Sequence, residues 1–595
     1  MSNTTVNLTI NNVPMSVPAG LTLIEAANRH GIAIPNLCYM PNVHEYGSCR
    51  LCVVEVEGAR TLQAACVTKV QEGMKVRTNS EKVRKARRVL YELILSDHSK
   101  DCLFCNRNQN CELQQLGKTL GVESSRFEGE RAACYTDVSV SITRDMSKCV
   151  LCRRCVTVCN DIQKAGILNA QNRGFSTEIS PPMGLPIGSV SCSFCGQCTV
   201  VCPVGALKET DATQKVWAAI ANPEIRTVVQ VAPAVRVALG EACGLPPGER
   251  VTGKMVAALR RLEFDDIFDT NFAADLTIIE EGTEVLGRIE AALTGKSAVL
   301  PVITSCSPGW IKHVEHTYPD LLSHLSTCKS PHMMLGALIK SFYAKKLNVD
   351  PKNVFVVSIM PCTAKKFEVS RQGMTNDGVP NVDAVLTTRE LGDMIATAGI
   401  NFASLPDEGF DEPLGISSGA ADIFGITGGV MEAALRTVHE LVTGKPLNLR
   451  FEPVRGFEQI KEAAIPLDDV KPEYSHLKGA VLRIAVTSGL SGANRLMDMV
   501  AVGASPYHFN EVMGCPGGCI MGGGQPRSQD PDIRNKRLKA LYSEDESKKL
   551  RVSHENPALK SLYADFLKDP GGHLAHELLH THYVPRGIFN ERLKD

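Results

Sequence analysis

Apolar and polar side chains alternate from the first residues of the chain. This pattern predicts a β-hairpin with one buried face, turning at Asn11-Asn12. Thr22 and Glu25 have the spacing of a capping box ahead of an apolar stretch, so a helix is expected next. A hairpin followed by a helix fits a β-grasp module ending near Asn79. The alternating positions are Val6, Leu8, Ile10, Val13, Met15 and Val17.

From about Arg226 onward, strand-like and helix-like stretches alternate. Residues 302–303 and 354–359 are continuous apolar runs, as expected for strands buried on both faces of a parallel sheet. A third strand-like stretch, 511–513, leads into glycines that permit close backbone approach. Ligands of such sheets sit beyond the carboxyl ends of the strands. We therefore expect a site where these runs end.

Length and charge limit the possible functions. At 595 residues the chain is long enough for several domains, since a single core rarely exceeds about 250–300 residues. The net charge of -1 points neither to nucleic acid nor to an anionic membrane as a partner. The first residues, MSNTTV, are polar, and no stretch keeps about 18 apolar residues in a row. A cytoplasmic location is expected.

The 22 cysteines fall largely in tight C-x2-C groups, which favours metal binding over disulfides. The first group follows the β-grasp pattern and predicts one [2Fe–2S] cluster, since glycine and serine near Gly47 let the loop wrap a cluster whose sulfurs need backbone N–H donors. Zinc is the alternative, because four thiolates also satisfy tetrahedral Zn²⁺. The group consists of Cys38, Cys49, Cys52 and Cys66.

A second group combines one histidine with three cysteines, which suits a [4Fe–4S] cluster. Neutral imidazole makes the site less negative than four thiolates and is expected to raise its reduction potential. Zinc is again the alternative. The residues are His98, Cys102, Cys105 and Cys111.

Two C-x2-C-x2-C-x3-C runs match the halves of a bacterial two-cluster ferredoxin, in which the fourth cysteine of each run ligates the other cluster. Pro203 follows the second run as the motif expects, whereas Asn160 replaces that proline in the first. One [4Fe–4S] cluster is thus assigned to Cys149, Cys152, Cys155 and Cys202, and another to Cys192, Cys195, Cys198 and Cys159. Together the groups predict a relay of one-electron carriers leading to a redox catalyst.

The predicted architecture is multidomain, α+β in the first half and α/β in the second. The expected modules are a β-grasp [2Fe–2S] domain, a histidine-ligated [4Fe–4S] module, a two-cluster ferredoxin domain and a large α/β catalytic domain. Their predicted ranges are 1–79, 80–138, 139–215 and 222–595.

Three motifs mark the second half: TSCSPGW from Thr304, MPCTAKK from Met360 and EVMGCPGGC from Glu511. With this cluster series they resemble the active-site motifs of the [FeFe]-hydrogenases, and the resemblance covers nearly the whole chain. The cluster-binding modules alone also resemble the large iron–sulfur subunit of NADH:quinone oxidoreductases. The three motifs separate the two families.

The resemblance implies an H-cluster, a [4Fe–4S] cubane joined through a cysteine sulfur to a two-iron unit with CO, cyanide and a bridging dithiolate amine. It implies Cys362, Cys515 and Cys519 as cubane ligands, with Cys519 the bridging thiolate. Lys365 is expected to hydrogen-bond a cyanide. The residues expected around the two-iron unit are Met360, Met513, Ala232 and Pro233.

The first motif departs from the commonest family pattern, in which two adjacent cysteines shuttle protons and ligate the cubane. Here the pair is Cys306 and Ser307. Either Cys306 ligates, or it keeps the proton role and Ser307 or another ligand completes the cubane. Ala234 and His332 also stand where the family often has polar residues, which is expected to alter tuning of the centre.

A proton route is also implied by the resemblance. Glu281, Glu284 and Arg288 in IIEEGTEVLGR and Ser326 in LSTCKSP match the family's relay segments. Heterolytic cleavage of H2 needs a base and a chain of titratable groups to water, and buried carboxylates with a raised pKa suit that task.

The resemblance further implies a subunit of a cytoplasmic NAD(P)-linked or electron-bifurcating complex, with ferredoxin as a further partner. No G-x-G-x-x-G fingerprint occurs, so flavin and NAD(P) are expected on other subunits. The alternatives are a stand-alone ferredoxin hydrogenase and a non-catalytic sensor or electron-transfer subunit, which the Cys306-Ser307 departure keeps open.

Two features remain outside these groups. His576 and His580 lie in an H-E-x-x-H pattern of zinc proteases, but near the chain end helix packing is the preferred interpretation. Cys134, Cys243 and Cys328 fit no ligand spacing and are expected to be buried apolar thiols.

Overall fold

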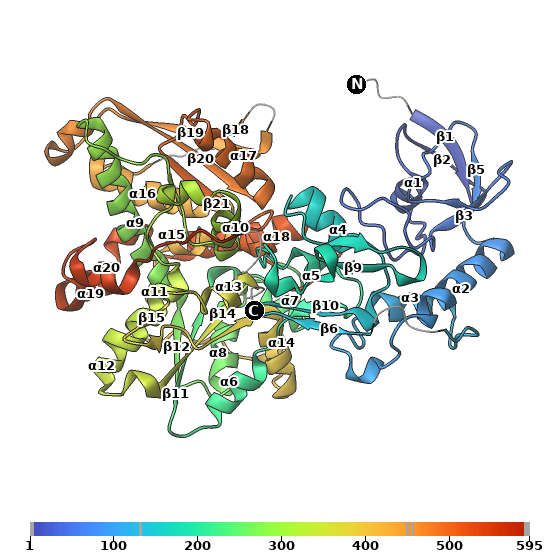
Figure 1. The fold of residues 1–595 in the computed structure, drawn as a ribbon, viewed down its shortest axis with the longest axis horizontal. Coiled ribbons are helices and arrows are strands. Elements are labelled where there is room, and N and C mark those ends of the chain that lie inside the picture. The colour runs from blue at the N-terminus through green and yellow to red at the C-terminus, as the bar shows by residue number, and fades with distance from the viewer. Residues whose placement is uncertain (1–4, 130–133, 448–451, 455–456, 588–595) are drawn as a thin grey trace. The chain divides into compact units, whose positions relative to one another are not determined.

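The computed structural model describes residues 5–129, 134–447, 452–454 and 457–587 (Figure 1). Contacts between Cα atoms divide the chain into two compact units. The first comprises residues 1–188 and 201–208, and the second comprises residues 189–200 and 209–595. The segment 189–200, which carries three cysteines of the second ferredoxin-like run, therefore belongs with the large second unit.

The first unit begins with the predicted hairpin and helix. Strands β1 (Thr5–Ile10) and β2 (Val13–Pro18) pair antiparallel, and Asn11 and Asn12 adopt φ values of 52° and 67°, as a two-residue hairpin turn requires. Helix α1 (Leu23–Arg29) carries the expected capping box. The sheet order is β2-β1-β5-β3-β4, with β1 and β5 parallel, and the remaining strands are β3 (Val53–Val56), β4 (Gln63–Ala64) and β5 (Lys75–Arg77).

Short elements follow in the rest of this unit, where loops rather than long helices present the cysteines. A sheet of order β10-β7-β6 and a β8-β9 hairpin support these loops. The elements are α2 (Glu81–Ser96), α3 (Glu112–Leu120), β6 (Thr136–Val138), β7 (Ile142–Asp145), α4 (Arg154–Thr157), β8 (Asn169–Gln171), β9 (Glu178–Ser180) and β10 (Leu207–Glu209), whose last residue falls in the second unit.

The second unit is built on two sheets. The first has the order β12-β11-β14-β17 and is parallel throughout (Figure 1). Its strands are buried along nearly their whole length, because helices such as α8 (Thr252–Arg261) and α14 (Thr388–Thr397) pack against them. The strands are β11 (Arg226–Val231), β12 (Asp266–Asp269), β14 (Val354–Met360) and β17 (Ala384–Thr387).

The second sheet has the order β13-β21-β20-β19-β18 and is mixed. Its first three strands run parallel, and the last two add antiparallel pairs. The predicted strands at 302–303 and 354–359 thus exist, but they lie in different sheets. The strands are β13 (Val302–Ile303), β18 (Glu452–Val454), β19 (Phe457–Leu467), β20 (Ala480–Ser488) and β21 (Phe509–Met513).

Helices enclose both sheets, and the longest, α9 (Thr270–Leu293), follows β12 directly. None of the helices described is long and apolar enough to cross a membrane. The other helices are α5 (Gln197–Val201), α6 (Thr213–Ile220), α7 (Leu239–Ala242), α10 (Pro308–Thr317), α11 (Pro331–Leu338), α12 (Ala344–Leu347), α13 (Ala364–Glu368), α15 (Gly419–Asp422), α16 (Gly429–Thr443), α17 (Leu490–Ala501), α18 (Ile533–Ser547), α19 (Pro557–Leu562) and α20 (His573–Leu579).

The three leftover cysteines do not share one environment. Cys328 is buried as expected and Cys243 is half-buried, but Cys134 is exposed, so the expectation was wrong for that residue. Cys134 lies in a connecting segment outside the described helices and strands.

Candidate metal centre and redox relay

The first cysteine group lies on the loops around β3 and β4. The sulfurs of Cys52 and Cys66 are 3.4 Å apart, and the Cys49 amide donates to the Cys38 sulfur at 3.4 Å. The hydrogen bond from Cys38 lowers the pKa of Cys49 to about 6, in the direction that metal ligation needs. Four thiols on one buried loop cluster fit a small iron–sulfur site.

The histidine-containing group lies between α2 and α3. His98 and Cys111 are buried, whereas Cys102 and Cys105 are partly exposed. A Cβ atom at Gly205 would approach the Cys105 sulfur to 2.8 Å, so this position accommodates the thiol only because it has no side chain.

In the first ferredoxin-like run, the structure gathers the four cysteines that the crossed pattern predicts. Cys149, Cys152, Cys155 and Cys202 line one pocket, and Cys159 does not line it. Cys159 instead accepts a hydrogen bond from the Ile167 amide at 3.4 Å. The ligand set stays a prediction, but the grouping has the donors that a [4Fe–4S] cluster needs.

Cys192, Cys195 and Cys198 belong to the second unit, whereas Cys159, their predicted fourth partner, belongs to the first. Both runs share the same backbone conformation: Leu151 and Phe194 have φ values of 50° and 55° at equivalent positions. These turns wrap the chain around the space between the cysteines.

The segment that carries these three cysteines packs directly on other loops of the same unit, the second. Thr363 donates its hydroxyl proton to the carbonyl of Phe194 at 2.7 Å, and the Cys515 sulfur lies 3.8 Å from the carbonyl oxygen of Cys195. A Cβ atom at Gly523 would lie 2.3 Å from that same carbonyl oxygen. Glycine at position 523 therefore allows the backbone of the 192–198 segment to contact the backbone of the loop that follows Cys519.

A further group of thiols lines one cavity of the second unit. Four strands from both sheets, β11, β13, β14 and β21, end at this cavity, so their carboxyl-terminal loops build its wall. The predicted site residues that line it are Ala232, Pro233, Ala234, Cys306, Ser307, His332, Met360, Cys362, Lys365, Met513, Cys515 and Cys519.

Ionisation of the thiols in this cavity is unfavourable without a nearby cation. Burial raises the pKa of Cys519 to about 12 and also raises that of Cys362, and in Cys519 the neighbouring Cys362 adds to the effect. The pKa of Cys515 lies well above its ordinary value, because it is buried and surrounded by Cys362, Cys195 and Cys519. A metal cluster would stabilise the thiolate forms of these clustered thiols, so the group fits an iron–sulfur centre.

Cys306 and Ser307 face different neighbours. The Ser307 hydroxyl accepts a hydrogen bond from the Gly514 amide at 3.0 Å, directly beside Cys515. Burial, followed by the nearby Glu281 carboxylate, raises the pKa of Cys306 well above its ordinary value. Ser307 is thus oriented toward the loop of two predicted ligands, and Cys306 toward a carboxylate.

An ionic network behind Lys365 was not predicted from the sequence. Lys365 donates to the Cys306 carbonyl at 3.1 Å and to Glu368 at 2.8 Å, and Glu368 is also 2.8 Å from Nε2 of His332. Burial opposes ionisation of Glu368, but Lys365 and His332 outweigh it and hold its pKa at about 2. Burial and Lys365 lower the pKa of His332 to about 4. The i, i+3 spacing of Lys365 and Glu368 was the only available signal.

The predicted proton route forms a connected chain on α9. Ser326 donates to Glu284 at 3.2 Å, and Glu284 pairs with Arg288 at 2.6 Å. Glu281 is buried, and burial together with Glu284 raises its pKa to about 8 even though a hydrogen bond from Ser326 opposes the shift. Glu284 and Arg288 line an open hollow, so the chain extends from beside Cys306 toward solvent. A carboxyl with this pKa exchanges protons readily near neutral pH.

Glu511 belongs to one of the three motifs, but no role was predicted for it. It lies within β21, is fully buried, and accepts hydrogen bonds from the amides of Gly428 and Met431, both at 2.7 Å. Burial raises its pKa to about 7, and these amides reduce the shift. It therefore adds a second titratable carboxyl near the thiols.

The two histidines of the H-E-x-x-H pattern differ in environment. His576 is exposed on α20, whereas His580 is buried, and its Nε2 lies 3.1 Å from Glu280. The two rings lie against each other with centroids 4.2 Å apart, and both nitrogens of His580 have partners, Thr327 on Nδ1 and Glu280 on Nε2.

Family comparisons match most of the chain. A domain described as "Iron only hydrogenase large subunit, C-terminal domain" matches residues 225–523, and "Iron hydrogenase small subunit" matches residues 531–586. A 2Fe-2S iron-sulfur cluster binding domain matches residues 3–81. An iron-sulfur binding region of NADH-ubiquinone oxidoreductase-G matches residues 87–126, and the ferredoxin-like domain of NADH-quinone oxidoreductase subunit 3 matches residues 139–208.

Similar proteins align over nearly all of the chain. The NADP-reducing hydrogenase subunit HndD of Solidesulfovibrio fructosivorans is 49% identical, with 97% of this chain and 99% of the relative covered. Iron hydrogenase 1 of Clostridium pasteurianum is 39% identical, with 96% and 99% covered. A solved variant of [FeFe]-hydrogenase HydA1 from Chlamydomonas reinhardtii has a TM-score of 0.58 at 46% identity, covering 62% of this chain and 98% of that chain.

The buried Glu281 carboxyl leads to a stability prediction. With a folded pKa of about 8 against an ordinary value of 4.5, the folded state binds a proton between these values that the unfolded state has lost. Stability therefore falls as pH rises through this window, by a few kcal/mol, since a tenfold change in proton affinity corresponds to about 1.4 kcal/mol. We expect the thermal midpoint of Glu281→Gln to decline less between pH 6 and pH 9 than that of the unsubstituted protein.

Scanning calorimetry at several pH values measures this difference. Glu290→Gln, on the exposed side of the same helix, is the matched control and should follow the unsubstituted protein. Equal declines in the Glu281→Gln variant and the unsubstituted protein would contradict the prediction.

Proposed function

The chain belongs to the iron-only, or [FeFe], hydrogenases and is an oxidoreductase that acts on H2, and from this premise we propose how its residues divide the work. In this proposal H2 is interconverted with protons and electrons at an H-cluster. The cluster would lie in the cavity at the carboxyl ends of β11, β13, β14 and β21. The observation that carries it is the convergence of Cys362, Cys515 and Cys519 on that cavity.

In the proposed arrangement Cys362, Cys515 and Cys519 hold the cubane, with Cys519 bridging to the two-iron unit. When bound, the H-cluster supplies an open iron site for heterolytic cleavage of H2. Lys365 is fixed by Glu368 and the Cys306 carbonyl and would offer its third N–H to a cyanide, while Met360 and Met513 would exclude water. Ala232 and Pro233 close the same wall.

We assign the proton role to Cys306, because Glu281 is the charged neighbour that acts most strongly on its thiol. A proton would pass from Cys306 to Glu281, then through Ser326 to Glu284 and Arg288 at the open hollow. Each step joins groups that can both accept and donate, except the terminal Arg288, which orients Glu284.

Ser307 is the proposed occupant of the fourth corner of the cubane. Its hydroxyl oxygen lies beside the loop of Cys515 and lines the same cavity as the three cysteines. An oxygen ligand is harder than a thiolate, so this corner is expected to hold its iron less firmly than the other three.

Electrons would travel through the N-terminal clusters, one [2Fe–2S] and three [4Fe–4S], one of them ligated by His98. The contact of Cys195 with Cys515 supports the last step. We further propose the four domains at 1–79, 80–138, 139–215 and 222–595. The similarity to an NADP-reducing hydrogenase subunit supports a cytoplasmic complex with flavin- and NAD(P)-binding subunits, and with ferredoxin as a further electron partner.

A docking surface for such a partner is available near the histidine-containing cluster. Leu103 and Phe104 are 84% and 91% exposed, between Cys102 and Cys105. Adjacent large apolar side chains at such exposure are typical of protein interfaces. Contact there would bring a partner cofactor close to the cluster that accepts or delivers electrons.

The central test is infrared spectroscopy of the anaerobically matured protein, combined with H2-driven reduction of a viologen dye. We expect CO and cyanide bands together with turnover. Cys515→Ala should lose both, because a buried ligand cannot be replaced by a methyl group, whereas Cys243→Ala should keep both as the control. Bands with negligible turnover would indicate a sensor, and the absence of bands an electron carrier only.

The roles of Cys306 and Ser307 can be separated by two substitutions. Cys306→Ala should keep the cubane signal in electron paramagnetic resonance but lose turnover by about 100-fold or more, as expected for a positioned proton carrier. Ser307→Ala should instead convert the cubane to a three-iron form, and Ser307→Cys should restore it. Loss of the cubane in Cys306→Ala would reverse the assignment.

Removing the exposed apolar pair tests the partner proposal. The double change Leu103→Ser with Phe104→Ser should weaken assembly with flavin-containing subunits about tenfold or more, the effect of removing an aromatic anchor. H2-driven viologen reduction should stay unchanged. Phe175→Ser, at a residue 60% exposed elsewhere in the same unit, is the control. Unaltered assembly would indicate docking elsewhere or a stand-alone enzyme.

A further inference from the structure

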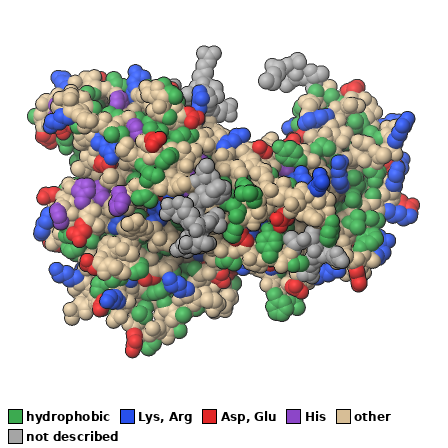
Figure 2. All heavy atoms as spheres, viewed as in Figure 1, with side chains coloured by type: hydrophobic (Ala, Val, Ile, Leu, Met, Phe, Trp, Pro, Cys, Tyr) green, Lys and Arg blue, Asp and Glu red, His purple; other side chains and the backbone are tan. Residues whose placement is uncertain are grey.

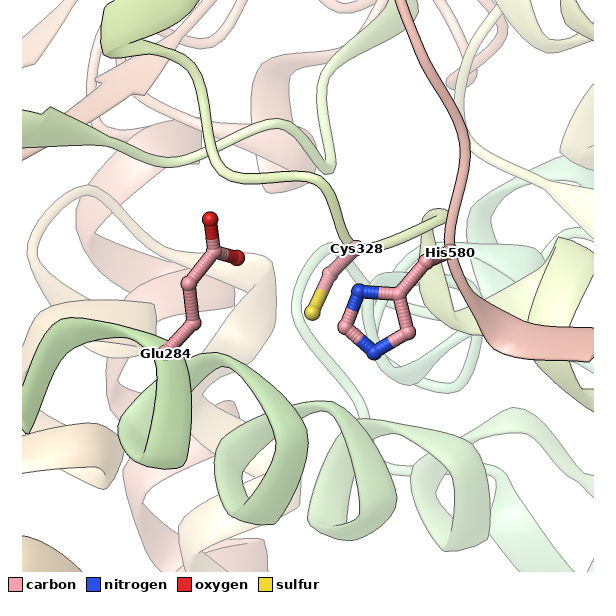
Figure 3. Close-up of side chains that lie close together, drawn as sticks. All are labelled: Glu284, Cys328 and His580. Carbon is pink, nitrogen blue, oxygen red and sulfur yellow. The ribbon is translucent and has the colours of Figure 1, made fainter. Parts of the chain in front are cut away.

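Three side chains of different chemistry meet at the outer end of the proposed proton route. Glu284 comes from α9, Cys328 from the loop after Ser326, and His580 from the end of α20, and Figure 3 shows their carboxylate, thiol and imidazole turned toward one another. Their donor atoms all lie within 4.8 Å of each other. Residues 284, 328 and 580 are distant in sequence, so the fold itself creates this group.

The backbone fixes two of the three donors. Cys328 and His580 form an isolated antiparallel β-bridge, and side chains directly opposed across such a bridge lie on the same face. The amide of Thr327 donates to Glu284 at 3.0 Å, which ties the helix to the same loop. The three donors are therefore held in place before any ligand arrives.

Thr327 adds a fourth donor atom, its hydroxyl oxygen. Its hydroxyl lies 3.1 Å from Oε2 of Glu284 and 2.8 Å from Nδ1 of His580. In a tetrahedral zinc site, bonds of about 2.0–2.3 Å place neighbouring donors roughly 3.3–3.7 Å apart. The Thr327 hydroxyl therefore lies close to that spacing from two of the three other donors.

The second nitrogen of His580 is also arranged as in metal sites. Nε2 lies 3.1 Å from Glu280, whose carboxylate further accepts from the Gly571 amide at 2.9 Å and from the Tyr563 hydroxyl. A carboxylate behind a ligating histidine fixes its tautomer and strengthens it as a ligand.

The local charge favours a cation. Burial raises the pKa of the Cys328 thiol, and Glu281, Glu284 and Glu280 add to this effect, so a positive ion beside the thiol would offset both causes. Arg288 opposes this effect, but it engages Oε1 of Glu284 and leaves Oε2 toward Thr327. Glu284 lines an open hollow, which connects this one donor to solvent. Figure 2 shows histidines gathered on the surface over α20.

We propose that Glu284, Cys328 and His580, with the Thr327 hydroxyl as fourth donor, bind a borderline-soft divalent cation such as Zn²⁺. Binding converts the Cys328 thiol to a thiolate and releases its proton to solvent. No oxidation or reduction is involved. The expected consequence rests on the proposed function: an ion on Glu284 occupies a proton-relay carboxylate, so it inhibits turnover reversibly.

The test is a Zn²⁺ titration of the matured, cluster-loaded protein, with bound zinc measured by X-ray absorption at the zinc edge and H2-driven dye reduction measured in parallel. We expect one site with sulfur, nitrogen and oxygen ligands, and inhibition that a chelator reverses. Cys328→Ala and His580→Gln should each weaken zinc binding by at least about tenfold, as loss of a ligand requires. Cys328→Ser preserves side-chain volume should the alanine variant fold poorly.

The chain offers a matched control, since Glu440, His554 and Glu555 form a second group without a thiol and nearer the surface. His554→Gln should leave both the sulfur-ligated site and the inhibition unchanged. Unaltered sulfur ligation and inhibition in Cys328→Ala would overturn the proposal, as would zinc binding without inhibition. Zinc binding at this site in a protein without H2 activity would contradict the proposed function but not the site.

Discussion

The second unit depends on holding several thiols inside one cavity. Cys515 is buried, Cys362 and Cys519 are half-buried, and removal from solvent raises the pKa of all three, so free thiolates are unfavourable there. Two features of the chain make the arrangement possible. Strands of two separate sheets end at the same place, and glycines such as Gly523 let the loops approach backbone to backbone.

The same burial explains the polar groups around the cavity. Glu368 remains ionised because Lys365 and His332 both contact it, whereas among the described residues no such cation contacts Glu281 or Glu511, and burial raises their pKa values to about 8 and 7. One carboxylate is thereby held as an anion, and the other two have pKa values at which a carboxyl exchanges protons near neutral pH. The difference in pKa follows from the side chains that contact each carboxyl, because all three carboxyls are buried.

Local patterns were enough to predict the N-terminal hairpin and the capping box of α1, since turns and caps are set by neighbouring residues. The grouping of Cys202 with the first ferredoxin-like run came instead from the two-cluster motif and stays a prediction. The sequence also identified every strand end that carries a motif. It could not assign β13 and β14 to different sheets, because each has the same continuous apolar pattern and pairing depends on distant segments. Glu368 and Glu280 were missed for the same reason, since their partners are side chains that only the fold brings near. The exposure of Cys134 was also missed, because spacing carries no information on burial.

The position of Glu284 links proton transfer and cation binding through one physical requirement. A relay carboxylate near solvent must be reachable by protons and must keep lone pairs free of permanent cations, yet Arg288 is needed to hold it in place. The structure meets both demands by placing Arg288 on Oε1 and only hydroxyl and amide donors on Oε2. In the proposed cation site a thiol and an imidazole lie beside that second oxygen, whose lone pairs would accept either a proton or a divalent cation. On this proposal, sensitivity to such ions follows from building the relay from accessible carboxylates, and Cys328 and His580 set its strength.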